Sequence, residues 1–397
     1  MSTRAGAPRP ALLLLAYLAF VSLGLPDGLL GVGWPSIRTE FGVPTEAVGI
    51  LLTVGAAGYL TSGVLAGFTL ARLGIGRLLT GSTLLAGLTL TGYALSPRLA
   101  VMIGCAFLLG IGSGAIDSGL NAYAAAAFGP RHMNWLHAFF GLGVALGPLI
   151  MTAAISLGLG WRWGYATVAA AQLALATAFA LTIRAWRHGS DTTAGVAGDS
   201  TPPPPAAPVP VGETLRLPAV WLGTLAFMLY VGVEAAAGLW AYLLLTEGRG
   251  VGAAVAGICV SAYWGSLFVG RLVQGVLAER LGAARVLRAN LYGMAVGAGL
   301  IALPAPAWVA VAGLVVLGFT AAPVFPLLTL TTAERVGAAH ADRTIGIQIG
   351  ASSLGVSLLP AGIGVLLSRY SVEWLGPALV VLTVALVALH TAASRRR

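Results

Sequence analysis

The sequence predicts an all-α membrane protein in which twelve transmembrane helices form two pseudo-symmetric six-helix bundles. Of its 397 residues, 58% are hydrophobic and only 9% are charged, and the mean hydropathy is +0.90. Soluble domains carry about 25% charged residues, so this chain is far from their composition. Its apolar residues also fall into twelve stretches long enough to cross a bilayer, which takes about 20 residues each. An internal repeat relates the first six stretches to the last six.

The twelve apolar stretches form two sets separated by a polar segment. They cover residues 11–36, 45–70, 76–96, 98–127, 133–159 and 162–185, then 218–246, 252–279, 284–304, 307–333, 342–368 and 372–393. The segment between the sets is polar and rich in Pro, which is typical of a flexible linker. We therefore expect an N-terminal bundle over 1–186, a linker over 187–216 and a C-terminal bundle over 217–397.

Two motifs recur in the same order in both sets. The pattern Gly-x4-Arg-Leu-Gly-x2-Arg begins at Gly67 and again at Gly275, about half the chain later. A Leu-Gly-Val triplet followed by Pro occurs over 142–148 and again over 354–360. The matches indicate duplicated halves related by an axis along the membrane normal, with a substrate site between them near the midplane.

The basic residues predict how the chain is oriented. All 22 are Arg; sixteen lie at the termini, the linker and the loops on one side, five lie on the other side, and Arg271 lies inside a span. Cytoplasmic loops are enriched in basic residues, so we expect both termini and the linker in the cytoplasm. The use of Arg without Lys, with abundant Ala and Gly, indicates the cytoplasmic (inner) membrane of a bacterium. Loop clustering argues against nucleic-acid binding, which needs a basic face.

One acid lies in an otherwise apolar stretch. Asp117 is flanked by Leu, Ile, Ala and Gly, and Asn121 follows four residues later, so the two side chains share one helix face. A carboxylate in hydrocarbon costs at least ~2.5 kcal/mol, so such residues usually face a bundle interior or an aqueous cavity. The functional interpretation is an acid that is protonated in one state and ionised in another. The alternative is a structural acid bound to a neighbouring helix.

Two further acids lie inside predicted spans. Glu234 follows Tyr230 by one helical turn, and it either forms an architectural ion pair with Arg271 of the neighbouring span, contacts substrate, or does both. Asp27 lies in a Gly-rich first span, and interrupted helices of this kind tend to line a cavity. Its alternative is a polar residue near the end of a tilted helix. We expect Asp117, Glu234 and Asp27 to take part in proton coupling.

The twelve spans and the duplicated loop motif resemble the major facilitator superfamily. The motif supplies Arg72 and Arg77 in its first copy and Arg280 and Arg285 in its second. The usual family motif also has an Asp in this loop, where the present chain has Ala in the first copy and Glu in the second. The resemblance implies the major facilitator fold and structural or gating roles for these four arginines and for Arg271.

Within the superfamily, several stretches are similar to the fucose:proton symporter group. They are Gly114-x2-Asp117-x3-Asn121, Asn134-x2-His137-x-Phe139, Tyr230 to Glu234, Ala262 to Gly265, Gly270-Arg271 and Phe325-Pro326. The resemblance implies that Asp117 is the fourth-span acid tied to proton coupling. It also places Asn134 and His137 where the group has fifth-span amides. The first-span acid of the group would fall near Gly31, one turn from Asp27, which leaves the role of Asp27 open.

The predicted substrate site draws polar and aromatic side chains from both halves. Its candidates are Asn121, Asn134, His137, Tyr230, Glu234, Trp264 and Gln348. A lone helical His is more often a packing residue, yet its near-neutral titration suits a proton relay or a sugar ligand. Gln348 holds roughly the repeat-equivalent position, which favours binding. Trp264 either stacks on the apolar face of a sugar or simply packs.

These features predict a secondary active transporter that symports a proton with a small polar solute, favoured to be a monosaccharide, by alternating access. The alternative is a proton-driven exporter of drugs or of amphiphilic, lipid-like compounds. No nucleophile, base and orienting group occur together, so an enzyme is not indicated. The two cysteines, in different halves, predict neither a disulfide nor a metal site, and we expect no cofactor. The expected partners are the solute, the proton and the lipid bilayer, with the protein a monomer.

Overall fold

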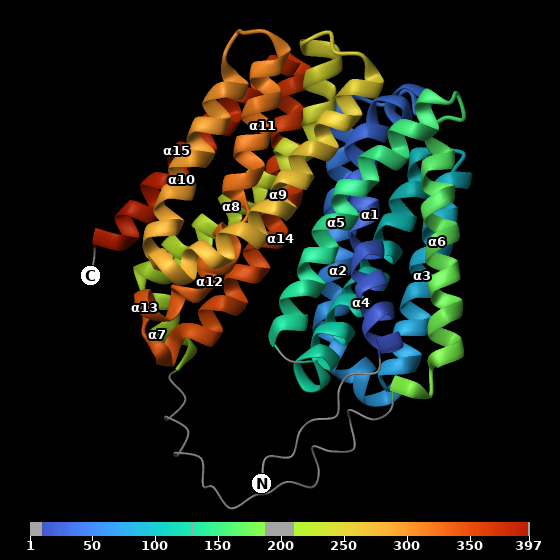
Figure 1. The fold of residues 1–397 in the computed structure, drawn as a ribbon, viewed down its shortest axis with the longest axis horizontal. Coiled ribbons are helices and arrows are strands. Elements are labelled where there is room, and N and C mark those ends of the chain that lie inside the picture. The colour runs from blue at the N-terminus through green and yellow to red at the C-terminus, as the bar shows by residue number, and fades with distance from the viewer. Residues whose placement is uncertain (1–9, 129, 187–209, 396–397) are drawn as a thin grey trace, which may run out of the picture.

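The computed structural model describes residues 10–128, 130–186 and 210–395, and every regular element in these ranges is helical (Figure 1). The predicted all-α membrane fold is therefore confirmed. Most of the predicted linker, residues 187–209, lies outside the described residues. Its last residues form a short helix, α7 (Val211–Arg216), where the sequence predicted only irregular structure.

The helices follow the predicted stretches closely. In the first half they are α1 (Pro10–Phe41), η1 (Thr45–Ala47), α2 (Val48–Leu73), α3 (Ile75–Leu95), α4 (Leu99–Ala127), α5 (Pro130–Ser156) and α6 (Trp161–Thr182). In the second half, α7 is followed by α8 (Pro218–Leu243), η3 (Leu244–Gly248), α9 (Ala253–Leu281), α10 (Ala283–Ala302), α11 (Ala307–Ala321), α12 (Val324–Leu330), α13 (Thr332–Val336), α14 (Ala338–Arg369), η4 (Val372–Trp374) and α15 (Leu375–Arg395).

Two of the predicted spans differ in detail from simple apolar helices. Eleven helices of the described chain are long and apolar enough to cross a membrane, and α10 is not among them. Arg285, Arg288 and Asn290 lower the hydropathy of α10, although it is long enough to span. The predicted stretch 307–333 is interrupted between α11 and α12 around Pro323, which has no N–H to continue the helical hydrogen bonds.

The same pattern of helix pairs occurs in both halves. In the first half α1 packs on α5, α2 on α4 and α3 on α6. In the second half the corresponding helices pair in the same way, α8 with α14, α9 with α11 and α10 with α15. The repeat found in the sequence is therefore also a repeat of the packing.

A glycine of the repeated Leu-Gly-Val triplet explains part of that packing. A Cβ atom on Gly143 of α5 would lie 2.0 Å from the carbonyl oxygen of Val21 on α1. Its repeat equivalent, Gly355 of α14, would place a Cβ atom 2.3 Å from the carbonyl oxygen of Met228 on α8. In both halves the missing side chain lets two helix backbones touch, which is the main use of Gly in membrane helix packing.

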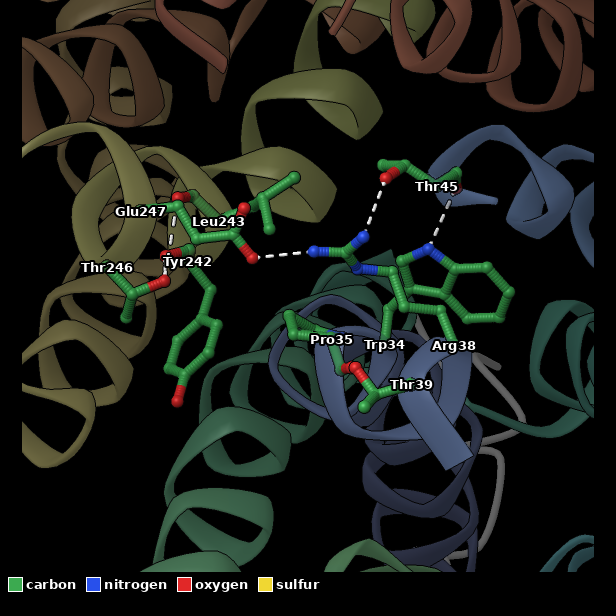
Figure 2. A network of polar contacts seen from close by, with 9 residues as sticks. All are labelled: Trp34, Pro35, Arg38, Thr39, Thr45, Tyr242, Leu243, Thr246 and Glu247. Carbon is green, nitrogen blue, oxygen red and sulfur yellow. Dashed lines mark hydrogen bonds and ion pairs between the residues drawn. The ribbon is translucent and has the colours of Figure 1, made fainter. Parts of the chain in front are cut away.

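The two halves meet at the side of the molecule away from the linker, here called the far side. At the end of α1, the Arg38 guanidinium lies 2.7 Å from the Glu247 carboxylate at the end of η3 (Figure 2). Arg38 also donates to the Thr45 hydroxyl at 3.1 Å, and the Trp34 indole donates to the Thr45 carbonyl at 2.8 Å. This network fixes Arg38 toward the second half.

Backbone contacts between the halves also lie toward the far side. A Cβ atom on Gly31 of α1 would lie 2.9 Å from the carbonyl oxygen of Leu239 on α8, and one on Gly49 of α2 would lie 2.5 Å from the Cβ of Ala361 on α14. At the opposite, linker side, the ends of α5 and α13 are separated (Figure 1). The structure is thus closed between its halves on the far side.

The close contact at Gly143 predicts the effect of adding a single methyl group. Gly143→Ala should lower the thermal unfolding midpoint of the purified protein, because the new Cβ meets a backbone carbonyl that cannot rotate away. Overpacking of this kind costs about 1–3 kcal/mol. Gly81→Ala on α3 is the matched control, since nothing lies within 4 Å of its Cβ position. Equal midpoints for the two variants would contradict the packing described here.

Candidate functional site

Asp117 on α4 accepts hydrogen bonds from two neighbouring side chains. The Tyr59 hydroxyl of α2 donates to Oδ2 at 2.6 Å, and the Asn121 amide donates to Oδ1 at 2.9 Å. Both carboxylate oxygens therefore have a donor, an arrangement that stabilises a negative charge. Tyr59 was missed from the sequence, because nothing in its own apolar stretch indicates that it faces α4. Its side chain is 39% exposed.

A second acidic group lies in the other half, on α8. The Tyr230 hydroxyl donates to the Glu234 carboxylate, and the Tyr263 hydroxyl of α9 donates to the Glu234 backbone carbonyl at 2.8 Å. The Arg271 guanidinium of α9 lies 4.0 Å from the Glu234 carboxylate, so the ion pair considered from the sequence is present but long. The exposed fractions of the two side chains are 15% for Glu234 and 25% for Arg271.

Arg271 links the Glu234 group to the first half. Arg271 donates to the backbone carbonyl of His137 on α5 at 3.5 Å. The His137 ring is exposed and packs edge-on against Phe20 of α1, with 5.4 Å between the ring centroids. We call the resulting set the interbundle polar cluster. Its members are Tyr59, Asp117, Asn121, His137, Tyr230, Glu234 and Arg271.

Asp27 lies on α1, and its side chain is exposed. Gly31, one turn later on the same face, contacts the backbone of α8. Asp27 is therefore on the side of α1 that turns toward the second half, in the middle of a long helix rather than at its end.

Trp264 and Gln348, the other predicted substrate residues whose side chains are described, have different surroundings. Trp264 is partly buried and packs over Gly238, where a Cβ atom would lie 2.1 Å from the indole ring. Gln348 is 1% exposed and accepts a hydrogen bond from the Thr332 hydroxyl at 3.1 Å, inside the second half and away from the cluster. The side chain of Asn134 lies outside the described residues.

The duplicated loop motif has a clear backbone role. Gly74 and Gly282 join consecutive helices with φ of 70° and 89°, in the left-handed region that favours Gly. The four motif arginines, Arg72, Arg77, Arg280 and Arg285, are exposed at these turns, and no ion pair in the described part of the chain includes them. Among the same described residues, no group of three His, Cys, Asp or Glu could hold a metal ion.

Known proteins share this fold over almost the whole chain. One curated relative is "Bypass of stop codon protein 6" of Saccharomyces cerevisiae, which is 22% identical over 94% of this chain and 80% of that protein. Another is an uncharacterized MFS-type transporter of Yersinia pestis, which is 26% identical over 93% of this chain and 92% of that protein. The solved nucleoside transporter NupG superposes with a TM-score of 0.78 at 13% identity, over 96% of this chain and 99% of that one. The peptide transporter POT, solved in complex with sulfate, superposes with a TM-score of 0.73 at 15% identity, over 99% of this chain and 96% of that one.

The likenesses to the solved structures show the fold. Neither the relatives nor the solved structures single out the fucose:proton symporter group. The family itself follows from a match of residues 16–360 to the family model described as Major Facilitator Superfamily. The chain therefore belongs to the Major Facilitator Superfamily and is a multi-pass membrane transporter.

Proposed function

We propose that the protein symports protons with a small polar solute, and that the solute is a monosaccharide. The observation that carries the proposal is the interbundle polar cluster. Ionisable groups inside membrane spans are costly, and they are usually found where ions or polar substrates are handled. Here an acid from one half and an acid–arginine pair from the other lie on either side of the seam between the halves.

The proton is assigned to Asp117. In its ionised form Asp117 accepts from Tyr59 and Asn121, which holds all three side chains in place. Protonation turns one carboxylate oxygen into a donor and removes the charge that hydrocarbon disfavours. The protonated acid can then donate to a solute hydroxyl while the halves close around it. Glu234 and Asp27 are the further acids of the proposed coupling path.

The solute class follows from the mixture of donors and acceptors in the cluster. Carboxylates accept, the guanidinium of Arg271 donates, and Asn121 and His137 can do both. Sugar hydroxyls also donate and accept, so a monosaccharide can satisfy each of these groups. The partly exposed Trp264 ring offers an apolar surface for a sugar ring. Nucleoside and peptide transporters share the fold, so the fold does not identify the solute and only the residues of the site can indicate it.

In the proposed cycle the halves rock about this cluster. The excess of Arg on the linker side assigns that side, both termini and the linker to the cytoplasm of a bacterial cell. The ends of α5 and α13 that are separated in Figure 1 then lie on the cytoplasmic side, and the Arg38–Glu247 pair joins the halves on the outer side. Gln348 packs inside the second half in this state and takes no part in the proposed site. The motif arginines are exposed in this state and could form ion pairs in the opposite state.

Asp117→Asn tests the assignment of the proton. Asparagine imitates the protonated acid in shape and charge, so solute exchange across proteoliposomes should persist. Uptake driven by an inward proton gradient should fall to the level of vesicles without protein. Glu213→Gln, which neutralises an exposed acid of α7, is the control and should transport like the unchanged protein. Gradient-driven uptake that survives in Asp117→Asn would remove Asp117 from the coupling path.

A solute screen tests the substrate class. Radiolabelled hexoses, pentoses, nucleosides and an amphiphilic dye would be offered to proteoliposomes with and without the proton gradient. We expect accumulation of a sugar that requires the gradient and is competed by related sugars. Absence of uptake of every sugar, together with proton-driven extrusion of the dye, would instead identify an exporter.

The Arg38–Glu247 pair should bias the halves toward far-side closure. Arg38→Gln removes the pair, and exposed ion pairs contribute about 0.2–1 kcal/mol, so the population open on the far side should rise by up to roughly fivefold. The change can be read as a longer distance between spin labels on Leu159 and Ala253, which lie on the far side in different halves.

A pair within one half provides the matched control. Arg162 and Glu40 lie 2.6 Å apart on the far side with similar exposure, but both belong to the first half. Arg162→Gln should therefore leave the label distance unchanged. Equal distances in the Arg38 and Arg162 variants would show that the interbundle pair does not hold the far side closed.

A further inference from the structure

A separate cavity of about 410 Å³ lies between α2 and α14, at the seam of the two halves. Its walls include Ile50 and Val54 from α2, and Ala361, Gly362 and Val365 from α14. The cavity is shallow and open, so it would cover one side of a bound group rather than enclose it. The lining side chains named here are apolar, so the cavity suits a hydrocarbon group.

The cavity opens on the bilayer side of the seam. Ile50 and Tyr59 are nine residues apart on α2, which places them on opposite faces of the helix, since an α-helix has 3.6 residues per turn. Tyr59 faces the interbundle polar cluster through its bond to Asp117. Ile50 is 50% exposed and faces away from that cluster. A molecule in the cavity would therefore enter from the lipid.

Charged groups lie at the far-side end of this cavity. Glu46, in the turn before α2, lines the cavity, and its carboxylate oxygen Oε2 is buried without a hydrogen-bond partner. A buried acceptor without a donor is unfavourable, so a donor that reaches the Glu46 carboxylate would stabilise it. Arg369, exposed at the end of α14, follows Val365 by one turn on the same face. An acid and a base thus lie at the far-side ends of two membrane-spanning helices.

We propose that this cavity binds one acyl chain of a phospholipid that has a primary amine headgroup, such as phosphatidylethanolamine. The ammonium group donates to Glu46, the phosphate pairs with Arg369, and the chain packs against Ile50 and Val54. A zwitterionic headgroup matches one acid and one base. A choline headgroup has no N–H to donate to Glu46, and an acidic lipid without an amine would bring only negative charge to it.

The lipid would bind best while the far side is closed. One wall of the cavity comes from each half, and the close contact of Gly49 with Ala361 joins the walls. When the halves separate on the far side, the chain loses one wall. A ligand that prefers one of two states shifts the equilibrium toward it, so this lipid would favour the state closed on the far side. This role is independent of the transported solute.

Native mass spectrometry of the delipidated full-length protein tests the site directly. Titration with phosphatidylethanolamine and phosphatidylcholine of equal chain length should show about tenfold tighter binding of the amine lipid, as expected for one charge-assisted hydrogen bond. Glu46→Gln, which has nearly the same shape, should abolish that preference. Val54→Trp, which fills the cavity, should weaken binding of both lipids.

Val381→Trp is the matched control, because Val381 is 67% exposed on α15, whereas the cavity lies between α2 and α14. It should bind both lipids as the unchanged protein does. The proposal fails if the unchanged protein binds the two lipids equally, or if Glu46→Gln keeps the preference for the amine. It also fails if Val54→Trp and Val381→Trp bind lipid alike.

Discussion

The free-energy cost of placing a charged group in hydrocarbon determines which side chains surround the buried acids of this protein. A carboxylate in a membrane span is tolerated only where other polar groups surround it. Asp117 meets that condition through Tyr59 and Asn121, and Glu234 meets it through Tyr230 and Arg271. Arg271 also donates to the His137 carbonyl, so the Glu234 group spans the seam between the halves. We propose that solvation of the acids and movement of the halves are coupled there.

Duplication provides the scaffold that holds this seam. Gly143 and Gly355 allow the same helix pair to touch in each half, and Gly74 and Gly282 make the same turn after the second helix of each half. The chemistry, in contrast, is not duplicated. Asp117 is on the fourth span of the first half, and Glu234 is on the first span of the second half. The two halves therefore share a framework and differ in what they bring to the site.

The fold was predictable from sequence to a much greater degree than the site. Hydropathy and the repeat located the spans, because each span must be apolar over a fixed length. Spacing along one helix related Asp117 to Asn121 and Tyr230 to Glu234. Spacing could not find Tyr59, whose bond to Asp117 depends on how α2 packs on α4. Gln348 was predicted to face the substrate by repeat position, yet it is buried and accepts a hydrogen bond from Thr332 of α13, a contact that one sequence does not reveal.

We propose that binding of the solute and binding of a proton at Asp117 are thermodynamically linked. Calorimetry of solute binding in buffers with different ionisation enthalpies measures that linkage on the purified protein, without a membrane gradient. We expect net proton uptake on solute binding by the unchanged protein, and none when Asp117 is replaced by Asn. Solute binding that takes up no proton in the unchanged protein would contradict it.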